Sequence, residues 1–94
     1  MEVQDSVSFN EHPGYSIEWG YATWSRDEEP ENKDWSIRNR YTNESGRFNY
    51  AGSSEVPWED FKRMIVESIK RGQFDQQELA EILSEIATSL SREG

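Results

Sequence analysis

The sequence predicts an α+β fold: an antiparallel meander of three to four strands, followed by two antiparallel amphipathic helices packed on one face of the sheet. Two observations predict it. Aromatic and β-branched residues alternate with small or polar ones over 15–24 and 35–42, which is the period of a strand. After residue 57 the apolar residues instead recur every three or four positions, which is the period of a helix. No strand-like segment follows the helices, so the pattern is α+β rather than α/β.

Length and composition predict one folded domain. A chain of 94 residues closes one modest core, so we expect a single domain over 1–94, with 1–6 frayed and 25–34 forming an acidic loop. Only 33% of the residues are hydrophobic, but 13% are aromatic, including four Trp. Each aromatic side chain buries about 150–250 Å², and disordered chains are poor in such residues. The aromatic content therefore favours a folded chain with a polar surface.

The two long strands are predicted to have one apolar and one polar face. Over 15–24 the large side chains fall on one face, and the small or polar ones fall on the other. The segment 35–42 repeats this alternation, with Arg38 and Arg40 on its polar face. The face expected to meet the helices carries Ile17, Trp19, Tyr21, Ile37 and Tyr41.

Turns and two shorter strands complete the predicted meander. Val7 and Phe9 alternate with polar residues and predict a short first strand. Pro13-Gly14 and the segment 43–46 have the composition of tight turns, in which glycine adopts a positive φ. A further strand is predicted over 47–51.

The helices are predicted from their ends as much as from their apolar stripes. Pro57 suits the first turn of a helix, and Gly72 suits its C-terminal cap. Asp75 and Glu78 have the spacing of a capping box at the start of the second helix. The stripe of this helix fits either a core or a homodimer seam. Homodimerisation would use Leu79, Leu83, Ile86 and Leu90.

Charge and composition restrict the function classes. The net charge is −9, and residues 1–34 hold nine acidic side chains against two basic ones. Such a chain repels phosphate backbones and favours a basic partner. There is no Cys and therefore no disulfide framework or thiolate site. No apolar run approaches the ~20 residues that span a bilayer, and the first residues do not resemble a signal peptide, so we expect a cytoplasmic protein without membrane contact.

Catalytic and metal-binding patterns are absent from the sequence. His12 is the single histidine and stands in a His-Pro-Gly turn without a second ligand or a paired nucleophile. The Gly52–Ser54 segment precedes a helix, but the acidic Glu55 and Glu59 that follow would repel an anion. The acidic loop lacks the spacing of an EF-hand. We expect no enzyme activity, no cofactor and no metal.

The remaining features point to protein binding. By strand parity Trp24 lies on the opposite face from Trp19, so it is exposed or covered by a loop, and Trp58 is expected at the rim of the core. The sequence therefore predicts a small acidic regulator, inhibitor or accessory subunit that binds a basic protein surface, or a charge mimic of nucleic acid if its acids share one face. The predicted partner-binding residues are Trp24, Asp27, Glu28, Glu29, Glu31, Arg38 and Arg40, with Asp34 completing the acids of the loop.

Two alternatives stay open. The first is nucleic-acid binding by a strand face bearing Arg38, Arg40 and Arg47, although parity places the aromatic residues near them on the other face. The second is a small ligand-binding or enzymatic domain with a cleft between sheet and helices. A purely structural subunit of a larger assembly would show the same sequence features as a protein-binding regulator.

Overall fold

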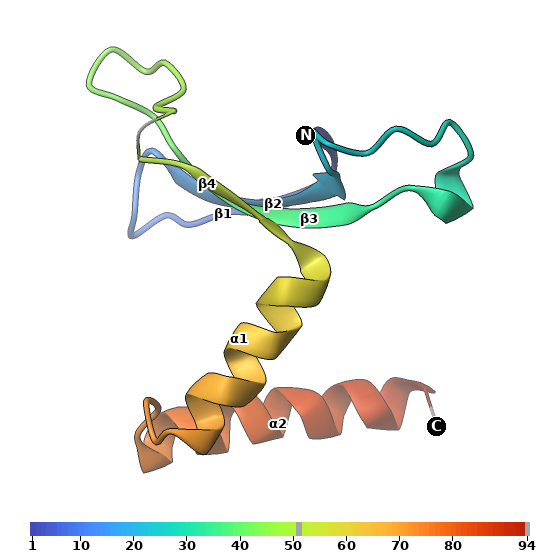
Figure 1. The fold of residues 1–94 in the computed structure, drawn as a ribbon. Helices are drawn as coiled ribbons and strands as arrows, with labels where there is room; N and C mark the ends of the chain where they lie inside the picture. Colours follow the sequence, from blue (N-terminus) through green and yellow to red (C-terminus); the bar gives the residue numbers. More distant parts are fainter. Residues whose placement is uncertain (51, 94) are drawn as a thin grey trace. The chain divides into compact units, whose positions relative to one another are not determined.

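The computed structural model describes residues 1–50 and 52–93, and these residues form an antiparallel sheet followed by two α-helices (Figure 1). The predicted α+β class is confirmed, with four strands in the spatial order β1-β2-β3-β4. A 3-10 turn, η1 (Pro30–Asn32), lies in the loop between β2 and β3. The elements are β1 (Glu2–Ser8), β2 (Tyr15–Tyr21), β3 (Trp35–Tyr41), β4 (Ser54–Pro57), α1 (Trp58–Lys70) and α2 (Gln76–Glu93).

The chain divides into two compact units. The first unit, Met1–Phe61, contains the sheet, its loops and the first turn of α1. The second begins at Lys62 and contains the rest of α1 and α2. The candidate site described below lies wholly within the first unit.

The first strand is longer than the sequence predicts. The segment 1–6 was expected to fray, but β1 pairs with β2 from Glu2 to Ser8, with Gln4 forming a bulge in the register. Gly20 in β2 explains this pairing: a Cβ at that position would collide with the Glu2 carbonyl and come within 2.9 Å of the Val3 Cα. The absent side chain thus lets the two backbones approach each other closely.

The fourth strand lies later in the chain than the sequence predicts. Within 47–51, Phe48 makes only an isolated bridge with Thr42, and Ala51 lies outside the described residues. The strand partner of β3 is β4, which includes Pro57, so α1 begins at Trp58. The reason is local: the Tyr41 N–H donates to the Ser53 Oγ at 3.0 Å, so a side chain takes the donor that a strand over 47–51 would have used.

The register of β2 and β3 confirms the two predicted faces. Tyr15 pairs with Tyr41, Trp19 with Ile37, and Tyr21 with Trp35, which sets these side chains on one face, here called the aromatic face. The opposite, charged face carries Glu18, Arg38 and Arg40. Among the described residues the buried side chains are Ala22 and Ser36, at 6% and 0% exposure. The aromatic face is therefore half-exposed instead of forming a closed core.

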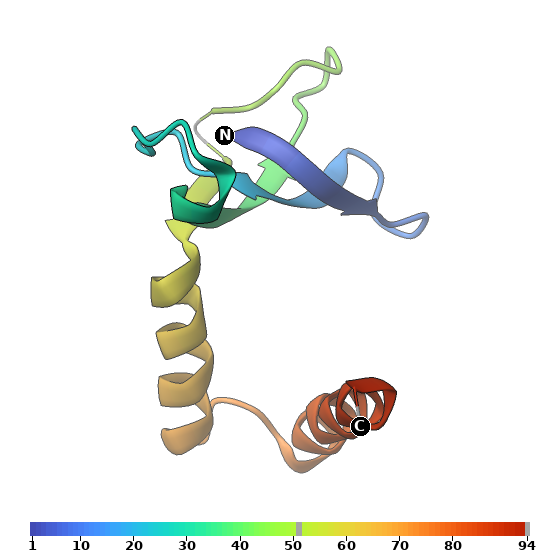
Figure 2. The ribbon, with the colours of Figure 1, turned by 90° about the vertical axis from the view of Figure 1, so that its right-hand side faces the viewer.

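The second unit confirms the predicted helix ends. The Asp75 N–H donates to the Glu78 Oε1 at 2.9 Å, and the Glu78 N–H donates to the Asp75 Oδ1 at 2.8 Å, so the capping box is formed. Gly72 adopts a φ of +70° where α1 ends. Within this unit α2 runs across the direction of α1 (Figure 2), where the sequence predicts an antiparallel pair. A short connection brings helices near each other in the chain but does not fix their crossing angle.

Neither described helix is long and apolar enough to cross a membrane.

Candidate functional site

Three tryptophans from three elements line one cavity on the aromatic face. Trp19 comes from β2, Trp35 from β3 and Trp58 from the first turn of α1. With Asp5 of β1 they line an open depression of about 480 Å³, which we call the tryptophan cavity. The sheet register brings the four residues together, because Asp5 pairs with Trp19 and because β4 carries the chain from β3 to Trp58.

A second cavity of about 320 Å³ adjoins the tryptophan cavity and shares Trp35 and Trp58 with it. Trp24, Lys33 and Asp34 also line it. The two cavities therefore form one groove, here called the tryptophan groove, that runs from Asp5 to Trp24. Trp24 and Trp35 are 41% and 42% exposed. Strand parity left Trp24 either exposed or covered by a loop, and the structure shows it exposed.

The groove region already holds one cation against an aromatic ring. The Lys33 Nζ lies 5.2 Å from the centre of the Tyr21 ring, which is a cation–π distance. Tyr21 in turn contacts Trp35 edge-on, with ring centres 5.1 Å apart. The aromatic face thus binds a positive charge of its own chain beside the groove.

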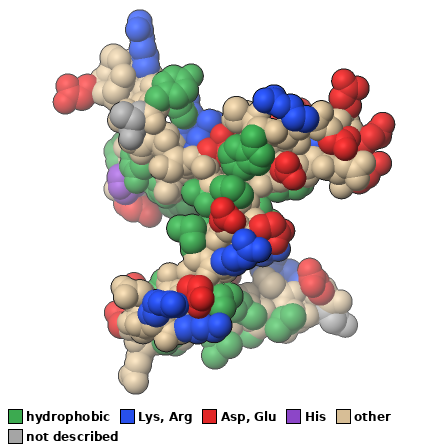
Figure 3. Space-filling view, in the orientation of Figure 1, with side chains coloured by type: hydrophobic (Ala, Val, Ile, Leu, Met, Phe, Trp, Pro, Cys, Tyr) green, Lys and Arg blue, Asp and Glu red, His purple; other side chains and the backbone are tan. Residues whose placement is uncertain are grey.

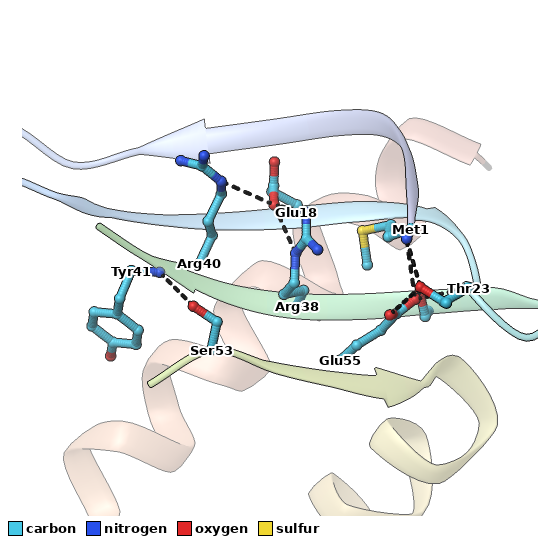
Figure 4. Close-up of polar contacts among 9 residues, drawn as sticks. Met1, Glu18, Thr23, Arg38, Arg40, Tyr41, Ser53 and Glu55 are labelled. Carbon is cyan, nitrogen blue, oxygen red and sulfur yellow. Dashed lines mark hydrogen bonds and ion pairs between the residues drawn. The ribbon is translucent and has the colours of Figure 1, made fainter. Parts of the chain in front are cut away.

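The charged face pairs its arginines internally (Figure 4). The Arg38 Nη2 lies 2.6 Å from the Glu18 Oε1, and the Arg40 Nε lies 3.8 Å from the same oxygen. The Phe48 ring covers both guanidinium groups, at 4.8 Å and 5.2 Å. The parity-based prediction that Phe48 falls on the apolar face is wrong, because the chain leaves the strand conformation before Phe48 and alternation no longer applies.

Arg38 and Arg40 therefore do not join Trp24. The three were predicted to share a role in partner binding, but the two arginines lie on the opposite face of the sheet from the tryptophan cavity. Arg47 follows the turn at 43–46 and is exposed. The structure thus separates the predicted contact residues into two groups.

On the charged face, Glu55 of β4 bonds to Thr23, which follows β2, and to Ser36 of β3. This role of Glu55 was not predicted from the sequence. Its carboxylate accepts hydrogen bonds from the Thr23 N–H and hydroxyl and from the Ser36 hydroxyl, at 2.7–2.9 Å. The Met1 amino group lies 4.0 Å from it. Burial raises the pKa of Glu55, but the hydrogen bonds outweigh burial, so its pKa lies below the usual value. No sequence signal marks this contact, because it joins residues far apart in the chain.

The acidic loop is exposed, and its acidic side chains gather at the upper right of Figure 3. The Asp27 Oδ1 accepts the Glu29 N–H at 3.0 Å, which orders the entry to η1. Glu28 and Glu31 are exposed in the same loop. Since Asp34 reaches the groove, the loop places negative charge at the Trp24 end of the groove.

His12 belongs to an aromatic cluster at the other end of the aromatic face. Its ring lies 5.0 Å from the ring of Tyr15, which also contacts Phe9 and Tyr41. The Tyr15 hydroxyl donates to the Asn39 Oδ1 at 2.8 Å. Burial and the neighbouring Tyr41 raise the pKa of Tyr15. This arrangement fixes the turn at 9–14 and gives His12 the role of a turn residue.

Metal-ligating side chains do not cluster in the described part of the chain. No group of three or more His, Asp or Glu side chains among residues 1–50 and 52–93 is placed to hold a metal ion. The chain matches no protein-family model, no curated protein and no solved structure. The function is therefore argued from the groove itself.

Sequence reasoning found the parts of the groove but not their assembly. Alternation placed Trp19 on the apolar face, and Trp58 was expected at the rim of the core. Asp5 was missed because its segment was expected to fray. The pairing of β1 with β2 is what brings this carboxylate to the indoles.

Proposed function

We propose that this chain is a non-enzymatic regulator, inhibitor or accessory subunit that binds a basic segment of another protein in the tryptophan groove. The observation that carries the proposal is the tryptophan cavity, in which Trp19, Trp35 and Trp58 face one space beside Asp5. Tryptophan is the most enriched anchor of protein interfaces, because its large, rigid side chain buries much surface at a small entropic cost. Four Trp in 94 residues supply such anchors, and none of the four is buried.

The charge distribution supports a basic partner. The net charge of −9 attracts a cationic segment from a distance, and the acidic loop adds charge next to Trp24. We assign contacts to Trp24 and to the loop acids. Arg38 and Arg40 are engaged with Glu18, so they are assigned a structural role.

The same pairing speaks against the nucleic-acid alternative. To meet a phosphate, Arg38 would have to leave a carboxylate oxygen 2.6 Å away and a covering aromatic ring. Breaking this charge-assisted contact would subtract from the free energy of phosphate binding, whereas an exposed, unpaired arginine would have no such contact to break.

The test is affinity capture with the tagged full chain from a lysate of its source cells, with and without nuclease. We expect one stoichiometric protein partner that survives nuclease. Trp35→Ala should lose it. Tyr50→Ala, which changes an 84% exposed aromatic residue on the charged face, should retain it. Because Trp35→Ala removes a contact with Tyr21, Asp5→Lys serves as a second variant that alters an exposed groove residue.

Recovery of nucleic acid, or of partners that vanish with nuclease, would refute the proposal and favour the arginine-face alternative. Equal capture by the wild type, Trp35→Ala and Asp5→Lys would place the partner on another surface. Circular dichroism of each variant establishes that the fold is retained.

We also propose self-association through α2, because its apolar stripe is exposed. Leu83, Ile86 and Leu90 are 66%, 50% and 64% exposed, at spacings of three and four. This is the spacing of a helix seam, and Leu79 extends it by one turn. Sedimentation over a range of concentrations should show a dimer that Leu83→Glu dissociates. Thr88→Glu, which adds the same charge on the opposite side of α2, should leave the dimer intact. A monomer at all concentrations would refute self-association.

A further inference from the structure

Two of the three indoles of the tryptophan cavity make ring contacts outside it. The Trp35 ring packs edge-on against Tyr21, and the Trp58 ring stacks on Phe61 with 5.5 Å between centres. Trp19 lies in the middle of β2, between the neighbouring positions Asp5 and Ile37. The ring contacts of Trp35 and Trp58 thus favour one orientation of these two indoles before a ligand arrives, which lowers the entropic cost of binding.

Asp5 gives the cavity a negative charge at its β1 side. Its Oδ1 accepts the Ser6 N–H at 2.9 Å, which fixes the carboxylate. The Oδ2 atom has no hydrogen-bond partner among the described residues and is available to a donor. Indole faces attract cations through their quadrupole, and a carboxylate adds a full charge and an acceptor. A cavity with both features selects a positively charged group that also has apolar faces.

The guanidinium of arginine fits this description better than an ammonium does. It is planar, weakly hydrated and stacks on aromatic rings, and its edge carries donors for a carboxylate. An unmodified lysine ammonium is strongly hydrated and loses more on entering an apolar space. We propose that the tryptophan cavity takes the guanidinium of an arginine side chain of the partner, lying against the indoles and donating to Asp5.

This inference rests on the proposed function and names the group that the groove recognises. The groove continues past Trp35 and Trp58 to Asp34 and Trp24, so residues adjoining the arginine would lie toward the acidic loop. The occupant is therefore an arginine within a basic segment of a protein.

The test uses the ¹⁵N-labelled full chain and short blocked peptides, Gly-Gly-Xaa-Gly-Gly, followed through the indole N–H resonances. Xaa is arginine, citrulline, lysine or trimethyllysine. We expect the arginine peptide to shift the Trp19, Trp35 and Trp58 signals saturably. Citrulline has nearly the same shape but no charge, and it should bind about tenfold more weakly.

Two variants locate the effect. Asp5→Asn should weaken arginine binding several-fold and bring it closer to the citrulline value, since the charge partner is lost. Tyr50→Ala, on the charged face, should leave the affinity unchanged. Retention of all indole signals at their free positions in Asp5→Asn shows that the cavity is intact.

Equal binding of arginine and citrulline would overturn the inference, and so would tighter binding of trimethyllysine than of arginine. If no peptide binds but a protein partner is still captured through Trp35, the arginine inference fails while the proposed function stands. If the arginine peptide binds the indoles but no protein partner is captured, the cavity's preference stands while the proposed function fails.

Discussion

Thr23 and Glu55 lie 32 positions apart in the sequence and share two hydrogen bonds. The Thr23 N–H donates to Oε1 at 2.9 Å, and the Thr23 hydroxyl donates to Oε2 at 2.7 Å. The Ser36 hydroxyl, on a fully buried side chain, donates to the same carboxylate. Glu55 therefore joins the end of β2 to β3 and β4. The ionised carboxylate accepts all three donors, whereas protonation turns one of its oxygens into a donor and weakens this arrangement.

The stability of the fold is expected to depend on the charge of Glu55. Because its pKa is lowered in the folded chain, the carboxylate stabilises the fold above the unfolded pKa, and this contribution is lost as the pH falls through the folded pKa. Glu55→Gln should lower the free energy of unfolding at neutral pH, and its difference from the wild type should shrink below pH 4.5, the ordinary value. Urea denaturation across pH measures this. Glu44→Gln, in an exposed turn, is the control, and a difference that does not change with pH would contradict the assignment.

Arg38 is expected to stabilise the sheet, whereas Arg47 is not. Arg38→Ala would leave the Glu18 carboxylate, whose side chain is 12% exposed, without its nearest partner. We expect a loss of about 1–3 kcal/mol in the free energy of unfolding. Arg47→Ala, at an exposed position, should change it by less than about 0.5 kcal/mol. Equal effects in chemical denaturation would show that the ion pair with Glu18 contributes nothing.

Gly20 is expected to be essential for β1. Gly20→Ala would push its methyl group into the backbone of Glu2 and Val3, so β1 should separate from β2 while β2 and β3 stay paired. Hydrogen exchange should then show lost protection over 2–8 and retained protection in β3. The control is Ser16→Ala, because Ser16 lies four residues from Gly20 on the same face of β2. Full protection of β1 in Gly20→Ala would contradict this account.

The capping box of α2 is expected to contribute measurably to its helicity. Asp75→Ala removes the acceptor of the Glu78 N–H and should cost about 1 kcal/mol of helix stability. Circular dichroism should show lower helicity and earlier thermal loss of the helical signal. Gln76→Ala changes the adjacent residue without touching the cap and should not lower the helicity. Identical thermal melting of both variants would mean that the capping box does not contribute to the stability of α2.

Local chemistry determined much of this fold from the sequence. Alternation set the faces of β2 and β3, since successive strand side chains point to opposite sides. The start of α2 followed from Asp75 and Glu78, because a capping box uses residues three positions apart. Strand parity took Trp24 off the face of Trp19 but left it either exposed or covered by a loop, and only the structure shows it exposed.

Contacts between distant residues were decided only by the tertiary structure. β1 can pair with β2 because Gly20 has no side chain to collide with the backbone of Glu2 and Val3. No local pattern in residues 1–6 predicts this pairing. Phe48 covers Arg38 and Arg40 because the chain turns back after β3, where parity ceases to apply. The tryptophan cavity needs β1, β2, β3 and the start of α1 in register at once. The sequence by itself specified the strand alternation and the helix caps, because these depend on residues that are close together in the chain. The tryptophan cavity was decided only by the tertiary structure, because it depends on how distant strands and the start of α1 pair in space.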